Sequence, residues 1–289
     1  MSEKPVRHII TVGSSVLTNS VMGSIGRGIA AQLQDRLKEI VNEDLERLAS
    51  NKVKCGEKVN AKLDDLVEVV REHPEIMSAE LNSLIKFMRS IYINNGKEPV
   101  LDEVSLICSE TPTGAASCYV LREVLERGID VDGYYLKPKV STYVVKALGN
   151  LGSSFSPASF YVGLLNLVCC ALRLCERGWR VLANLTGGFK PEVAYTTAIL
   201  MALSNIESIY YVHEGLKDVV LLPLLNLVVS SVNFKERLSK EPYKSYYQRA
   251  LGELYEVFVN EIENCILGRT YLMPCESLEE YLKRCKLIT

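Results

Sequence analysis

The chain has 289 residues, of which 48% are hydrophobic and 24% are charged. These proportions describe a globular protein with a sizeable core and exclude a disordered, collagen-like or fibrous chain. Its 33 basic and 35 acidic residues give a net charge of −2. That balance argues against a protein that coats long nucleic acid, but not against a local basic site.

The cysteines and the apolar stretches indicate in which cellular compartment the protein resides. The nine cysteines are odd in number, show no Cys-x-x-Cys spacing, and several lie in apolar runs. This favours buried free thiols in a reducing cytoplasm over an oxidised, secreted framework. Residues 1–7 carry no signal-peptide core, and the apolar stretches 158–172 and 219–232 are short for a membrane span of about 20 residues. We therefore expect a cytoplasmic protein with no membrane partner.

Buried strands and amphipathic helices alternate along much of the chain. Apolar, β-branched runs predict strands at 8–12, 104–108, 133–136, 179–184, 208–212 and 219–222. Helical patterns between them cover 115–127, 160–177 and 191–204. This alternation predicts an α/β fold with a mostly parallel sheet that is covered on both faces.

Two segments depart from this alternation. Residues 28–100 are helical and rich in charge, which predicts an inserted helical block whose solvated charges have no functional role. The alternation stops after Pro223, and residues 236–267 and 277–285 read as helices. We expect a first domain at 1–217 and a small, mainly helical C-terminal domain at 218–289.

Several common active-site patterns are absent from the sequence. The three histidines, His8, His73 and His213, are far apart and lack ligand spacing, which argues against a histidine-based zinc site. The glycine-rich segment 23–28 is not G-x-G-x-x-G, and no P-loop occurs. We expect neither a metal nor a cofactor.

Four strand ends carry polar or glycine-rich turns, and ligands of parallel α/β sheets bind at such ends. They are 13–15, 109–111, 137–139 and 184–190. In the last turn, Gly187 and Gly188 let backbone N–H groups approach an anion at a helix start, and Lys190 adds a cation. This chemistry suits a phosphate without a metal. A tight turn beside a solvated lysine remains the alternative explanation.

Three segments resemble one known family. The run VGSSVLTN at 12–19 resembles the VGTSLLTN opening of CRISPR-associated Rossmann-fold (CARF) proteins, and NLTGGFKP at 184–191 resembles their N-x-TGGFK motif. A third likeness covers 210–215 and 221–223. Together they frame residues 7–225 in the family's order and imply a Rossmann-like sheet. The most similar subgroup contains archaeal ring nucleases, which bind cyclic oligoadenylates, the second messengers of type III CRISPR systems, and cut cyclic tetra-adenylate without a metal.

The resemblance also implies roles for individual residues. Ser15 and Lys190 correspond to the catalytic serine and lysine, while Ser14 replaces the family's threonine and keeps its hydroxyl. Ligand contacts are expected from Gly13, Ser14, Ser15, Glu110, Thr111, Asn184, Thr186, Gly187, Gly188, Phe189 and Lys190. His213 and Glu214 match a segment that we interpret as structural.

The C-terminal segment argues against a fused effector. It contains no histidine, which excludes a HEPN ribonuclease, and residues 216–289 balance ten basic against ten acidic residues, which argues against a DNA-binding module. We therefore expect catalysis in the CARF domain. A ribose 2′-hydroxyl would attack its own phosphodiester and leave a 2′,3′-cyclic phosphate.

A four-fold ring suits the two-fold axis of a homodimer. We therefore expect cyclic tetra-adenylate as ligand and substrate, a homodimer, and no long nucleic acid as partner. Two alternatives stay open: a non-catalytic sensor of cyclic oligoadenylate that acts through its C-terminal domain, and an enzyme for another small anion.

Overall fold

The computed structural model describes residues 4–24, 30–149, 156–175, 178–188, 190–201, 206–213, 218–224, 235–236, 238–266 and 273–287. A seven-stranded sheet forms its centre, in the order β8-β7-β6-β1-β2-β5-β9. The strands are β1 (Val6–Thr11), β2 (Glu103–Ser109), β5 (Lys139–Val145), β6 (Arg180–Asn184), β7 (Ile206–His213), β8 (Asp218–Leu222) and β9 (Cys275–Ser277). The five central strands are parallel, and β8 and β9 are antiparallel edges. The predicted α/β fold with a mostly parallel sheet is confirmed.

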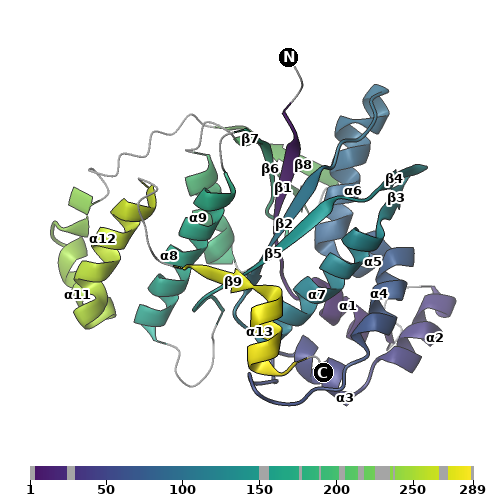
Figure 1. The fold of residues 1–289 in the computed structure, drawn as a ribbon, viewed down its shortest axis with the longest axis horizontal. Helices are drawn as coiled ribbons and strands as arrows, with labels where there is room; N and C mark the ends of the chain where they lie inside the picture. The colour runs from purple at the N-terminus through teal and green to yellow at the C-terminus, as the bar shows by residue number, and fades with distance from the viewer. Residues whose placement is uncertain are drawn as a thin grey trace.

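Helices cover both faces of this sheet (Figure 1). One side holds α1 (Ser15–Ser24), α2 (Ala31–Ile40), α3 (Glu43–Ala49), α4 (Leu63–Glu72), α5 (Pro74–Met77), α6 (Ala79–Ile91), η1 (Ile93–Asn95) and α7 (Pro112–Arg127). The other holds α8 (Pro157–Leu174) and α9 (Lys190–Leu200), with α11 (Tyr243–Leu251), η2 (Gly252–Leu254) and α12 (Tyr255–Ile266) beyond α8. The last helix, α13 (Leu278–Cys285), follows β9.

Local sequence signals fix the helices that begin at the sheet. Thr111 caps α7 by accepting a hydrogen bond from the Gly114 amide, and Pro112 suits its first turn. The helix ends at Gly128, whose φ of 92° only glycine adopts without strain. Ser156 and Ser159 form a reciprocal cap at the start of α8. The sequence therefore sets both the starts and the directions of helices that leave the strand ends.

Helix α8 is a core helix with two packed faces. By length and composition it could cross a membrane, and half of its apolar window is buried in the protein. Leu167 and Ala171 pack against the sheet in one core cluster, which also holds Ile9 of β1. Leu165 belongs to a second cluster, together with Phe258 of α12. This packing agrees with our interpretation of 158–172 as a buried core element.

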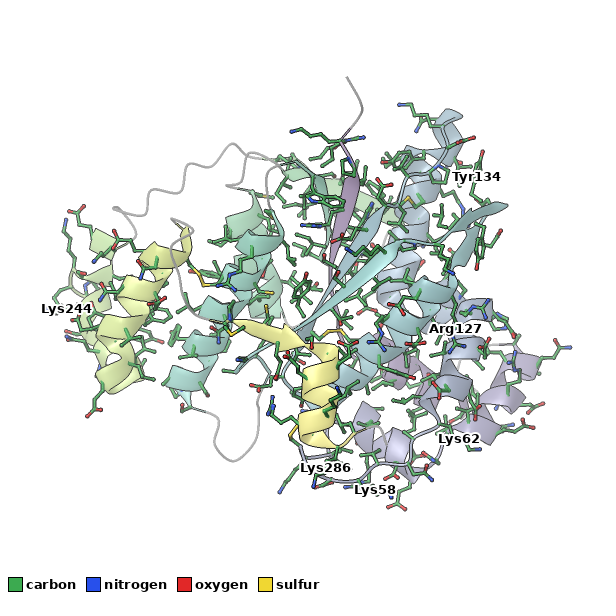
Figure 2. All side chains as sticks on the ribbon, viewed as in Figure 1. Lys58, Lys62, Arg127, Tyr134, Lys244 and Lys286 are labelled. Atoms are coloured by element: carbon green, nitrogen blue, oxygen red, sulfur yellow. A yellow bond between two sulfur atoms is a disulfide. The ribbon has the colours of Figure 1, made fainter. Side chains whose placement is uncertain are left out.

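The helical segment that we expected at 28–100 is helical over α2 to α6. Most of its charged side chains face solvent, as Lys58 and Lys62 illustrate in Figure 2. One glutamate, Glu80, departs from this pattern, because only 1% of it is exposed. The expectation that the charges of this segment are solvated is therefore wrong for Glu80.

Two predictions near residue 136, one of a strand and one of a turn at the ligand-binding edge, need correction. The run 133–136 contributes β4 (Tyr134–Leu136) to a separate two-stranded sheet with β3 (Ile129–Val131), and does not enter the main sheet. The next strand in the main sheet is β5, whose first residue, Lys139, pairs with Glu103 at the start of β2. The loop 137–139 therefore lies at the amino ends of the strands, opposite the edge where we expected a ligand. The run 133–136 is aromatic and apolar, a composition that suits a half-exposed hairpin strand as well as a buried one, so composition did not decide between them.

Segments on both sides of the expected boundary at residue 217 share the main sheet. Strand β8 pairs with β7, and β9 crosses to the opposite edge to pair with β5. Helix α13 then packs beside α7. Helices α11 and α12 pack on α8 and carry the helical content that we predicted for the C-terminal part.

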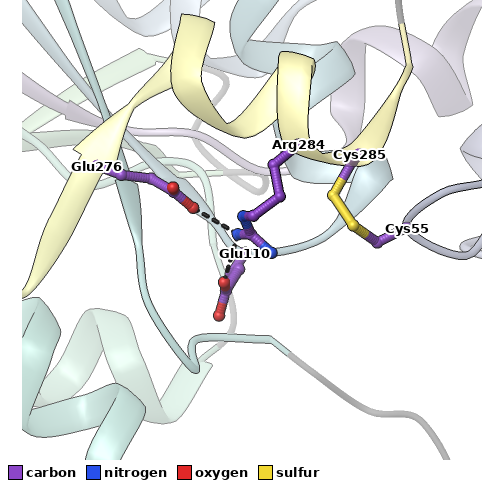
Figure 3. Close-up of a disulfide and its surroundings, with 5 residues drawn as sticks. All are labelled: Cys55, Glu110, Glu276, Arg284 and Cys285. Carbon is purple, nitrogen blue, oxygen red and sulfur yellow. Dashed lines mark hydrogen bonds and ion pairs between the residues drawn. A yellow bond between two sulfur atoms is a disulfide. The ribbon is translucent and has the colours of Figure 1, made fainter.

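The expectation of free thiols is wrong for six cysteines. Disulfides join Cys55 to Cys285, Cys108 to Cys118 and Cys169 to Cys265, while Cys170, Cys175 and Cys275 are thiols. The first of them attaches α13 to the loop after α3 (Figure 3). Partners 96 and 230 residues apart in sequence meet only through the fold, so spacing gave no signal of these pairs.

We predict that the Cys55–Cys285 disulfide contributes strongly to stability. It closes a loop of 230 residues, and loop-closure entropy for such a length corresponds to about 5 kcal/mol. The double variant Cys55→Ala/Cys285→Ala should lower the free energy of unfolding by this amount in urea titrations without reductant. An unchanged urea midpoint, or two reactive thiols at these positions in the native protein, would contradict the pairing.

Candidate functional site

A cavity of about 180 Å³ lies at the carboxyl ends of β1, β2 and β6. β1 is central, with β2 on one side and β6 on the other, and the chain builds the sheet outward in opposite directions from it. Such a switch in strand order opens a crevice where parallel α/β sheets bind ligands. The cavity therefore occupies the place that the sequence predicts for a ligand.

The lining of the cavity combines small hydroxyls with apolar side chains. The polar side chains are Thr11, Ser14, Asn51, Ser109, Thr111 and Thr113. The apolar ones include Val12, Ile107, Leu148, Leu167 and Val193. Such a mixture suits a ligand that is part sugar or phosphate and part flat ring.

Three helices begin where these strands end. The amino termini of α1, α7 and α9 follow β1, β2 and β6 after two to five intervening residues. Unpaired N–H groups and the helix dipole favour an anion near each of these termini. The predicted anion chemistry at the strand ends therefore has a structural basis beyond the glycines.

The first loop places its two serines differently. Gly13 and Ser14 line the cavity. Ser15 is half-buried beside them and turns toward α6: its Oγ donates to Glu80 Oε2 at 2.6 Å and accepts from the Ala79 amide at 3.1 Å. The serine expected to be catalytic is therefore held in a defined orientation by α6.

Glu80 is a residue of the site that the sequence analysis missed, as are Thr11, Asn51, Ser109 and Thr113 of the cavity lining. Glu80 Oε1 accepts from the Gly13 amide at 2.8 Å, and its Oε2 accepts from Ser15 and, at 2.8 Å, from the Ser78 hydroxyl. No ion pair between described residues includes Glu80, so hydrogen bonds and the start of α6 satisfy this buried carboxylate. A glutamate in the first turn of a helix is commonplace, and only its burial distinguishes it.

The loop after β6 is tied to the same glutamate. Asn184 is fully buried, donates from Nδ2 to the Glu80 carbonyl at 2.9 Å and accepts from the Thr186 amide at 3.2 Å. Thr186 Oγ1 accepts from the Val212 amide of β7 at 3.4 Å. Both side chains therefore shape the loop rather than point into the cavity.

Two glycines bring the loops after β1 and β6 into backbone contact. A methyl group on Gly187 would collide with Glu80 Oε1 and would lie 2.6 Å from the Thr11 carbonyl oxygen and 2.7 Å from the Gly13 nitrogen. Thr11 also donates from its hydroxyl to the Gly187 carbonyl at 2.6 Å. Gly188, with φ of 108°, lines the cavity. Gly187 requires glycine because the two backbones touch there, and Gly188 requires it because of its positive φ.

The loop after β2 connects the site to the C-terminal helix. Glu110 accepts from the Ala147 amide at 2.7 Å and from Arg284 of α13 at 2.7 Å, while Arg284 also bonds Glu276 (Figure 3). These carboxylates raise the pKa of Arg284 above its ordinary value. Thr111 lines the cavity, but Glu110 does not belong to its lining.

Two expected contacts lie outside the described residues. They are the whole of Phe189 and the side chain of Lys190, whose backbone begins α9. The structure brings Gly13, Ser14, Thr111 and Gly188 to the cavity, and places Ser15, Asn184, Thr186 and Gly187 immediately around it. Within the described ranges, no group of three or more His, Cys, Asp or Glu side chains could hold a metal ion.

We predict that Gly187→Ala disrupts the contact between the two loops. The added methyl group displaces Glu80 or the β1 loop, which should cost about 2–3 kcal/mol of stability in a urea titration. Gly133→Ala is the matched control, because its φ of 89° strains alanine while no atom lies within 4 Å, and it should cost about 1 kcal/mol. Equal losses for the two variants would contradict the close approach.

A comparison with known protein families finds a match for this chain. A model described as CRISPR-associated protein (Cas_APE2256) covers residues 75–225, which is 151 of the 289 residues and more than half of the chain. The matched part contains Glu80, β2, β6 and the loops that end these strands. A comparison with curated proteins finds no match. The chain therefore belongs to the CRISPR-associated Cas_APE2256 family.

Proposed function

We propose that this CRISPR-associated protein binds cyclic tetra-adenylate at the cavity and cleaves it as a ring nuclease. One observation carries the proposal: a cavity at the switch point of the sheet is lined by hydroxyls and by the backbone of Gly13 and Gly188. Such a lining offers hydrogen-bond donors to phosphate and ribose without a metal. The resemblance of both loops to CARF motifs and the membership of a CRISPR-associated family support the choice of ligand.

The proposed cleavage is a transesterification. The ribose 2′-oxygen attacks the adjacent phosphorus, the bond from phosphorus to the 5′-oxygen breaks, and a 2′,3′-cyclic phosphate forms. Backbone amides of the Gly187–Gly188 turn and the ammonium group of Lys190 stabilise the charge that develops on the phosphate. One preorganised donor of this kind contributes about 3–4 kcal/mol to lowering the barrier.

The size of the cavity supports a homodimer as the active form. At about 180 Å³ it is smaller than the roughly 300–1,000 Å³ of sites that enclose drug-sized ligands, and a ring of four nucleotides is larger still. A two-fold axis would place two copies of each loop around one ring. Each copy would then hold and cut one phosphodiester bond.

A sensor without cleavage activity is the second candidate, and one contact favours it. Arg284 of α13 joins the loop after β2 through Glu110, so the C-terminal segment touches the rim of the site. A ligand that displaces this contact would move α13 and signal its own binding. The two functions differ in the fate of the ring and not in its binding.

We predict that the purified protein converts cyclic tetra-adenylate to linear products with 2′,3′-cyclic phosphate ends in EDTA. Chromatography of the products measures this, and Lys190→Ala and Ser15→Ala should each slow cleavage about 100-fold or more. Lys137→Ala, an exposed lysine at the amino ends of the strands, is the matched control and should cleave normally. Tight binding of an intact ring would favour the sensor. The absence of both binding and cleavage would refute the proposed ligand.

A further inference from the structure

The hydrogen bonds around Ser15 determine which kind of ligand group its hydroxyl can still bind. A serine hydroxyl has one hydrogen to donate and two lone pairs with which to accept. Ser15 uses its hydrogen on Glu80 Oε2 at 2.6 Å and one lone pair on the Ala79 amide at 3.1 Å. Only one accepting lone pair remains. A ligand that reaches Ser15 from the adjoining cavity wall, formed by Gly13 and Ser14, can therefore offer it a ribose hydroxyl but finds no hydrogen left for a phosphate oxygen.

Glu80 enforces this orientation. An ionised carboxylate only accepts hydrogen bonds, so the hydroxyls of Ser15 and Ser78 must both point toward it. Hydrogen bonds to a charged acceptor are about twice as strong as neutral ones, and Glu80 is 1% exposed, which keeps water from competing. Two further hydrogen bonds hold Glu80 between the two loops: the Gly13 amide donates to its carboxylate, and Asn184 donates to its main-chain carbonyl.

We propose that Glu80 is a positioning residue that acts through Ser15 to receive the proton of the attacking 2′-hydroxyl. This inference rests on the proposed ring cleavage. The 2′-hydroxyl gives its proton to Ser15 Oγ while the original Ser15 proton moves to Glu80 Oε2. The 2′-oxygen forms its bond to phosphorus, and the bond from phosphorus to the 5′-oxygen breaks.

The protons balance through one water molecule. The departing 5′-oxygen takes a proton from water and becomes a hydroxyl group. The hydroxide that remains takes a proton from Ser15, and Ser15 recovers its own from Glu80. A serine hydroxyl by itself is a poor base near neutral pH, and the relay transfers that task to a carboxylate.

Glu80→Gln tests the relay because it reverses the orientation of Ser15 while preserving shape. The glutamine oxygen can still accept from Gly13, but its NH₂ group donates to Ser15 Oγ, which then turns its hydrogen outward. We expect kcat to fall about 100-fold or more while KM changes less than about threefold, since a general base contributes to the transition state alone. The double variant Glu80→Gln/Ser15→Ala should be no slower than Ser15→Ala.

Glu103→Gln is the matched control. Glu103 is also a buried glutamate, but it pairs with Arg7 at 2.9 Å and lies at the amino end of β2. The Glu103→Gln variant should be less stable than the wild type. At temperatures below its unfolding transition, however, its kcat should equal that of the wild type. If Glu80→Gln cleaves the ring at the wild-type rate while Ser15→Ala is inactive, the relay is overturned but the ring nuclease is not. No cleavage by the wild type would instead refute the ring nuclease.

A modified ring tests the same inference on the unmodified protein. In cyclic tetra-adenylate with 2′-fluoro groups, each 2′ position can accept but not donate a hydrogen bond. Wild-type protein should bind this ring about tenfold more weakly than the natural one, as expected for one lost hydrogen bond to a fixed acceptor. Ser15→Ala should bind both rings alike. Equal binding of the two rings by the wild type would contradict the assigned orientation of Ser15.

Discussion

Glu80, a buried residue of α6, holds together the loops after β1 and β6, two of the three strand ends around the cavity. It receives hydrogen bonds from the loop after β1, from Ser15 at the start of α1 and from Ser78 at the start of α6. Its own carbonyl is bound by Asn184 at the end of β6. Burying a carboxyl group is costly unless hydrogen bonds satisfy it, so the partners of Glu80 must keep their places. These hydrogen bonds fix the positions of the loops that line the cavity and so determine its shape on that side.

The C-terminal segment adds a second set of restraints around the cavity. Strand β9 extends the sheet beside β5, and α13 carries both Arg284, which bonds Glu110, and Cys285, which is joined to Cys55. The loop after α3 is thereby attached to the chain end, and its Asn51 lines the cavity. Disulfides of this kind occur in oxidising compartments and also in intracellular proteins of hyperthermophiles, so they suit more than one compartment.

The sequence predicted the parts of the fold that local patterns encode. Four of the five parallel strands and the glycine loops followed from β-branched runs that end in turns, and the cavity lies where those loops meet. β9 escaped prediction because a three-residue edge strand shares its composition with loops and turns. β5 was missed because the neighbouring run 133–136 was taken for the strand of the main sheet. Glu80 and the distant disulfides escaped because burial and pairing arise only when segments far apart in sequence meet. The orientation of Ser15 depends on that same long-range contact.

The stoichiometry of ligand binding tests the central claim, that one ring of cyclic tetra-adenylate is shared by the loops of two chains. Isothermal titration calorimetry in EDTA, with the slow variant Ser15→Ala to keep the ring intact, measures it directly. Our account predicts saturation at one ring per two chains, because a single cavity of about 180 Å³ holds only part of a ring. Saturation at one ring per chain, or no heat of binding, would contradict it.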